Sequence, residues 1–110
     1  MKILIDENLP LAFKESFGEH HEVFSARDMN WHGKKNGELL LLMIKAGFEG
    51  FVTMDKNLPH QQNLTNFPIT IFVLWGSNNK LSTLQELVPI LLSNIDNVTA
   101  TGRGVIEIRK

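Results

Sequence analysis

The chain has 110 residues, of which 43% are hydrophobic and 21% charged, and it contains no cysteine. This length suits one domain spanning residues 1–110, and the lack of cysteine excludes a disulfide scaffold, a thiolate zinc site and thiol catalysis. The net charge of −1 provides no general attraction to nucleic acid, and Asp6 interrupts the first apolar run too early for a signal peptide or membrane span, so a cytoplasmic protein is expected.

Apolar runs in the first half of the chain predict three strands, at residues 3–5, 22–24 and 50–54. Between these runs, apolar side chains recur at helical spacing over residues 9–17 and 38–46. Gly18 and Gly47 supply helix stops, and Asn36 is placed to cap the second helix.

The second half continues the alternation of strands and helices. A short helix is expected after Pro59, a strand over residues 69–75, and a final helix over 81–95 that Pro89 interrupts or delays. Residues 105–108 alternate in polarity and suit an edge strand. This order predicts an α/β fold with a mostly parallel sheet, right-handed crossovers and helices on both faces.

One five-residue pattern occurs twice, each time after an apolar run. Residues 6–10 read Asp-Glu-Asn-Leu-Pro and residues 55–59 read Asp-Lys-Asn-Leu-Pro. Proline suits the first turn of a helix, and asparagine supports the turn before it. Asp6 and Asp55 therefore follow strands, at the carboxyl edge of the sheet where α/β proteins bind ligands. Glu38 starts a helix that can open toward the same edge.

Carboxylates gathered at one edge repel one another unless protons or hard cations neutralise them. Oxygen ligands without histidine or cysteine favour Mg²⁺ or Mn²⁺, which can promote displacement at phosphorus. Lys34, Lys35 and Lys56 flank the acidic segments and are candidates for holding phosphates of a nucleic acid. The alternative is structural: each aspartate forms its own turn, Glu38 complements the helix dipole, and the lysines are simply solvated.

Other polar and aromatic residues are assigned structural roles. Asp28 follows Arg27, and a surface ion pair between the two is expected. Trp31 and Trp75 could stack on bases, but packing in the core or at its rim is the favoured interpretation. The four histidines show no metal-ligand spacing.

Three segments resemble the small PIN-like family related to VapC-type toxins. They are Ile-Leu-Ile-Asp-Glu-Asn-Leu-Pro at 3–10, His-Glu-Val at 21–23 leading to Arg-Asp at 27–28, and Phe-Val-Thr-Met-Asp-Lys-Asn-Leu at 51–58. The resemblance implies a PIN-like α/β/α sandwich, a Mg²⁺- or Mn²⁺-dependent phosphodiesterase site, an RNA substrate and an antitoxin partner. Asp6 would then be the first metal ligand and Asp55 the last acidic one.

The chain differs from the family pattern at the middle acidic position. The family commonly has aspartate where Asn36 stands, and asparagine can coordinate a cation but brings no charge. Either Glu38 takes that role or the site is weakened. Three functions stay open: a metal-dependent ribonuclease, a phosphoacceptor receiver domain with Asp55 as acceptor, and a non-catalytic binding module. A homodimer through the 81–95 helix or the 105–108 strand is also open.

Overall fold

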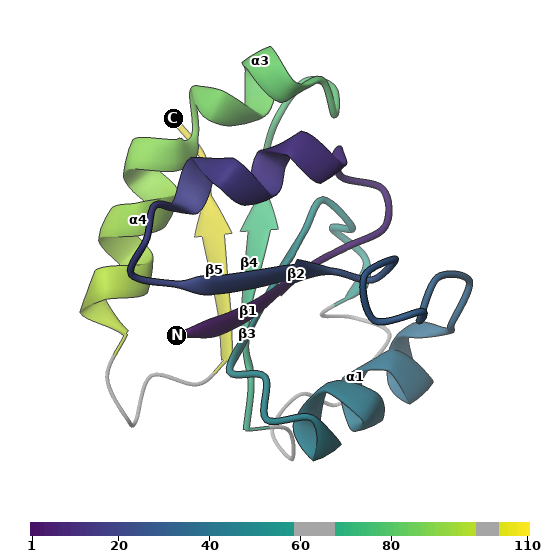
Figure 1. Cartoon of the computed structure of the whole chain (residues 1–110). Coiled ribbons are helices and arrows are strands. Elements are labelled where there is room, and N and C mark those ends of the chain that lie inside the picture. The colour runs from purple at the N-terminus through teal and green to yellow at the C-terminus, as the bar shows by residue number, and fades with distance from the viewer. Residues whose placement is uncertain (59–67, 99–103) are drawn as a thin grey trace.

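A five-stranded parallel sheet organises the part of the chain that the structure describes (Figure 1). This computed structural model describes residues 1–58, 68–98 and 104–110. The strands are β1 (Lys2–Ile5), β2 (Glu22–Ser25), β3 (Gly50–Thr53), β4 (Thr70–Leu74) and β5 (Gly104–Ile108). Their order is β2-β1-β3-β4-β5 and every pairing is parallel. The prediction of a mostly parallel sheet, with residues 105–108 at an edge, is confirmed.

Helices cover both faces of the sheet, which gives the three layers of a Rossmann-like sandwich (Figure 1). The 3₁₀ helix η1 (Leu11–Phe17) lies on one face with α3 (Leu81–Gln85) and α4 (Val88–Asn97), and α1 (Asn36–Lys45) lies on the other. Pro89 stands in the first turn of α4, so the predicted interruption of the final helix is confirmed. The helix expected after Pro59 falls outside the described residues. Within the described ranges, no helix combines the length and apolar character needed to cross a bilayer.

Two separate cores follow from the alternation of side chains along the strands. Ile3 and Ile5 of β1 pack in the core beneath η1, α3 and α4. Leu4, between them, packs in the core beneath α1, together with Phe51 of β3. The continuous apolar strands of the sequence are therefore explained by burial on both faces.

The connections to the two edge strands have opposite hands. η1 connects β1 to β2, and the α3–α4 segment connects β4 to β5 in the opposite direction along the sheet. Phe13 of η1 and Leu84 of α3 belong to one core, so both connections cross the same face. Two such connections cannot both be right-handed, and the prediction of uniformly right-handed crossovers is wrong. The connection from β2 to β3 through α1 has the same hand as the connection from β1 to β2. Of these three connections, the one from β4 to β5 therefore has the opposite hand.

The start of α1 also differs from its prediction. Lys35 occupies the N-cap position without a capping side-chain hydrogen bond, and Asn36 is the first residue of the helix. The Asn36 side-chain amide instead donates to Asp55 Oδ2 at 3.3 Å. The expected capping role of Asn36 is therefore wrong, because its amide contacts the carboxylate that follows β3. Gly47, with φ of 83°, follows the helix as predicted.

Candidate functional site

Asp6 and Asp55 meet at the carboxyl edge of the sheet and are joined through Thr53. The Thr53 hydroxyl donates to Asp6 Oδ2 at 2.6 Å, and the same oxygen accepts the Asp55 backbone N–H at 3.0 Å. One fully buried side chain thus contacts both predicted site residues. The spatial convergence of positions 6 and 55, expected from the repeated pattern, is present in the structure.

Strand register explains this arrangement. Ile5 lies opposite Val52, and the Asp6 N–H continues the ladder by donating to the Val52 carbonyl at 2.9 Å. Asp6 therefore lies beside Thr53. Side chains alternate along a strand, so Asp6 shares a sheet face with Leu4 two positions earlier, which is the face that α1 covers. The start of α1 reaches the same place through the contact from Asn36 to Asp55.

Burial is the largest influence on Asp6 and raises the pKa of its carboxyl above the ordinary value of 3.8. The neighbouring negative charges of Glu7 and Asp55 act in the same direction. The hydrogen bonds from the Thr53 hydroxyl and the Glu7 N–H oppose the rise, because they stabilise the charged form. Asp6 is thus a carboxylate whose negative charge the fold only partly compensates.

Asp55 is oriented by donors on both of its oxygens. The Asn57 N–H donates to Oδ1 at 2.9 Å, and the Asn36 amide donates to Oδ2 at 3.3 Å. A carboxylate oxygen can accept more than one hydrogen bond or ligand, so each oxygen keeps capacity to coordinate a cation. The bond to Asn57 also bears out part of the structural alternative, in which this aspartate forms its own turn.

Glu38 does not join the aspartate pair. Its carboxylate forms an ion pair with Lys34 at 3.1 Å, one turn away on an exposed surface. In the described ranges, no group of three or more histidine, cysteine, aspartate or glutamate side chains is arranged to hold a metal. Glu7 is also engaged elsewhere, because both of its carboxylate oxygens accept the Gly33 N–H, at 3.0 and 3.2 Å. The acidic centre that the structure assembles therefore consists of Asp6 and Asp55.

The oxygen donors at this centre are of the chemical kind that binds a hard cation. Mg²⁺ is commonly bound through one or two carboxylates, with water and substrate phosphate completing the shell. Asp6 and Asp55 supply two carboxylates, and Asn36, whose amide nitrogen faces Asp55, carries a carbonyl oxygen of the right chemistry. A site for two metals, with three or four bridging carboxylates, does not fit these residues.

Among the three lysines predicted to bind phosphate, Lys56 lies against an aromatic side chain, Trp75, at the carboxyl edge of the sheet. Its Nζ lies 4.5 Å from the centre of the Trp75 ring, and the Arg109 guanidinium lies 4.5 Å from the same ring. Lys34 is paired with Glu38, and Lys35 is exposed at the start of α1. We call Lys56, Trp75 and Arg109 the cation–indole layer.

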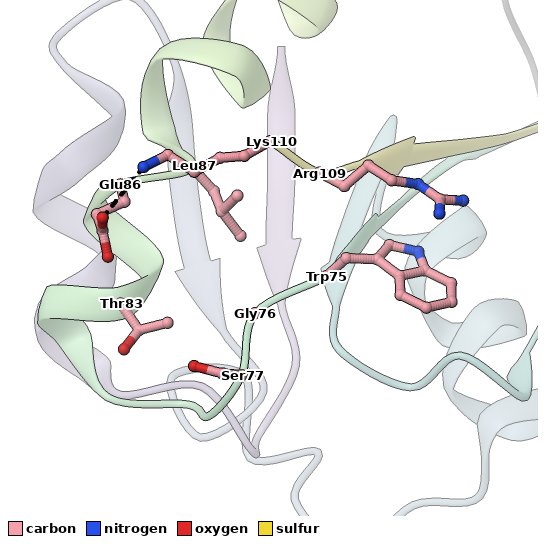
Figure 2. A pocket seen from close by; sticks show the side chains of 8 residues that line it. All are labelled: Trp75, Gly76, Ser77, Thr83, Glu86, Leu87, Arg109 and Lys110. Atoms are coloured by element: carbon pink, nitrogen blue, oxygen red, sulfur yellow. Dashed lines mark hydrogen bonds and ion pairs between the residues drawn. The ribbon is translucent and has the colours of Figure 1, made fainter.

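A hollow of about 330 Å³ opens nearby, between the ends of β4 and β5 and the α3–α4 segment (Figure 2). Ser77, Thr83 and Leu87 contribute to its lining, and the ion pair between Lys110 and Glu86 crosses its rim at 3.1 Å. In Figure 2 the side chains of Trp75 and Arg109 lie together and point away from the other labelled side chains that line this hollow. Trp75 and Arg109 also line this hollow, so the cation–indole layer borders it, and alternation along β4 puts Trp75 on the α1 side of the sheet.

Asp28 pairs with a residue that the sequence did not suggest. Its carboxylate accepts from Lys14 Nζ at 2.6 Å and from the Ser25 N–H at 2.9 Å, whereas Arg27 was the expected partner. These hydrogen bonds, that from Lys14 foremost, lower the pKa of Asp28 below 3.8. The pair joins η1 to the end of β2 and takes no part in the aspartate centre.

Sequence reasoning missed Thr53 and Arg109 as members of this edge. A threonine closing an otherwise apolar strand, two residues before an aspartate, was the available signal for Thr53. Arg109 carried no comparable signal, because its position beside Trp75 depends on the pairing of β5 with β4. No known family model, curated protein sequence or solved structure matches this chain.

Proposed function

We propose that the protein is a metal-dependent nuclease that hydrolyses RNA at the Asp6–Asp55 centre, using one Mg²⁺ or Mn²⁺ ion. The observation that carries the proposal is the convergence of the two aspartates on Thr53. The raised pKa of Asp6, to which the nearby negative charge of Asp55 contributes, favours a hard cation that both carboxylates would hold. The PIN-like resemblance of the two strand-end segments supports the same chemistry.

Each residue has a distinct part in the proposed reaction. Asp6 and Asp55 would hold the cation, the Thr53 hydroxyl fixes the Asp6 carboxylate, and the Asn36 amide donates to the Asp55 carboxylate. Bound at this position, the cation would neutralise charge that develops on the phosphate and lower the pKa of an attacking water. The water oxygen bonds to phosphorus as the P–O bond on the opposite side breaks, and the proton lost by the water balances the one gained by the leaving oxygen.

A cleavage assay with matched variants tests this proposal. Labelled single-stranded RNA is incubated with the protein and Mg²⁺, Mn²⁺ or EDTA, and the products are resolved on a gel. Asp6→Asn and Asp55→Asn should each abolish the cleavage that the metal supports. Asp96→Asn is the control, since Asp96 is an exposed aspartate on α4 whose carboxylate lies 3.7 Å from the ring of His21. Absence of cleavage with either ion, over several RNA and DNA substrates, contradicts the nuclease and favours a binding module that acts with an antitoxin-like partner.

A phosphoacceptor receiver domain is the second candidate, because the strand order is that of the flavodoxin-like doubly wound sheet used by receivers. Asp6 and Asp55 stand after the strands that carry the acidic pocket of such a domain. In a sheet of this order with right-handed crossovers throughout, the helix before β5 would lie on the same face as α1. In this chain α3 and α4 lie on the opposite face, and this difference argues against a receiver. Intact mass after incubation with a small phosphodonor and Mg²⁺ decides: one phosphoryl group gained on Asp55 supports the receiver.

A further inference from the structure

The cation–indole layer places two positive groups on one exposed ring. Lys56 Nζ and the Arg109 guanidinium each lie 4.5 Å from the Trp75 ring centre, so they are at most about 9 Å apart. The three residues come from separate segments: the turn after β3, the end of β4 and the end of β5. Trp75 keeps 38% of its surface exposed. The sheet thus collects an accessible aromatic ring and two cations at one point.

Among the described side chains, internal pairing compensates one of these two cations and leaves the other without a carboxylate partner. Arg109 contacts the carboxylate of Glu107, two residues earlier on β5. Lys56 has no carboxylate within ion-pair distance among the residues that the structure describes. An ammonium group so placed near a second cation is complementary to an anion, and a ligand with successive negative charges would satisfy both.

The layer also adjoins the aspartate centre. Lys56 directly follows Asp55 in the chain, and alternation along β4 puts Trp75 on the same sheet face as Val73, the face of α1 and Asp6. A chain of phosphates that reached the aspartates would therefore pass Lys56 and Trp75 next. Single-stranded nucleic acid combines this charge with bases that stack on aromatic rings.

We propose that Lys56, Trp75 and Arg109 form a subsite of single-stranded RNA, which holds the nucleotide next to the cleaved bond. The position of that bond rests on the proposed nuclease function of the Asp6–Asp55 centre. Phosphate oxygens are stronger partners for the two cations than the indole face is. The cations therefore move onto the backbone of the bound strand, and the ring they release stacks on a base.

Binding measured without cleavage tests this subsite. The anisotropy of a fluorescein-labelled single-stranded RNA is followed in EDTA, which silences any metal-dependent reaction. Trp75→Ala should weaken binding about tenfold, and Trp75→Phe should restore most of it, because phenylalanine keeps an aromatic face. Replacing Lys56 and Arg109 together by glutamine should weaken binding and reduce the slope of log affinity against log salt by about 1.4. Thermal melts of each variant establish that it is folded.

The matched control is Lys45→Gln. Lys45 is an exposed lysine in the last turn of α1, next to Ala46, whose carbonyl accepts from Lys2 at the amino edge of the sheet. This variant should bind as the wild type does. The inference is overturned if the wild type binds no single-stranded RNA in EDTA, if the layer variants bind as tightly as wild type, or if duplex RNA of the same length binds better. Failure of the nuclease would appear differently, as RNA bound through this layer but never cleaved.

Discussion

The buried hydroxyl of Thr53 donates to the carboxylate of Asp6 at 2.6 Å and joins the ends of two neighbouring strands. Because the same oxygen accepts the N–H of Asp55, a small movement of either strand end would disturb both aspartates. The geometry of the acidic centre therefore depends on a residue with no charge.

Thr53→Val should destabilise the fold and disorder the aspartate pair. Valine has nearly the shape of threonine, but it leaves Asp6 without its side-chain donor and the Asp55 N–H without its acceptor. Loss of a partner to buried polar groups costs about 1–3 kcal/mol, which urea unfolding can measure. Thr53→Ser keeps the hydroxyl and should retain most of the stability. Equal stability of the valine variant and the wild type would show that the hydroxyl does not support this edge.

Asp6→Asn should stabilise the protein near neutral pH while removing the proposed nuclease activity. The raised pKa of Asp6 means that the folded state favours the protonated form. Ionisation of this carboxyl therefore lowers the free energy of unfolding. The loss grows as the pH rises from the ordinary pKa of 3.8 through the higher pKa of Asp6 in the folded protein. Urea midpoints of wild type and variant should converge as the pH falls toward 3.8 and separate above it, with the variant higher. A variant less stable than wild type at neutral pH would contradict this interpretation.

Asp28→Asn should show the opposite pH dependence. The hydrogen bond from Lys14 lowers the pKa of Asp28, so its stabilising effect is present above 3.8 and is lost as the pH falls through the lower folded pKa. The variant should therefore have the lower urea midpoint at neutral pH, and the difference should shrink in acid. Because this ion pair is partly exposed, added salt should also reduce the difference. A difference that persists unchanged in acid and in salt would show that packing, and not charge, is responsible.

Asn36→Asp should bring a third carboxylate to the centre. The new charge would face Asp55, because the Asn36 amide already lies 3.3 Å from Asp55 Oδ2. We expect a lower thermal melting temperature without metal, from repulsion among the carboxylates, and several-fold tighter Mn²⁺ binding by calorimetry. Asn36→Ala controls for loss of the amide and should not tighten binding. Unchanged Mn²⁺ affinity in the aspartate variant would place position 36 outside the coordination sphere.

The parallel sheet and the meeting of the two aspartates could be predicted from the sequence. Continuous apolar strands and the repeated turn after β1 and β3 depend on local spacing, and residues that end parallel strands share one edge of the sheet. The partner of Glu38 could not be predicted, because spacing places it in the first turn of α1 without saying whether it faces Asp55 or Lys34. The hand of the last crossover also lacks a local signal, since it depends on which core α3 and α4 enter.

The most direct test of the acidic centre is a calorimetric titration of Mn²⁺ into the wild type, Asp6→Asn, Asp55→Asn and Glu38→Gln. We predict one bound ion for the wild type and also for Glu38→Gln, because the carboxylate of Glu38 is engaged with Lys34 and not with the centre. We predict no binding for either aspartate variant. Wild-type protein that takes up no ion, or an Asp6→Asn variant that binds as the wild type does, would contradict these predictions.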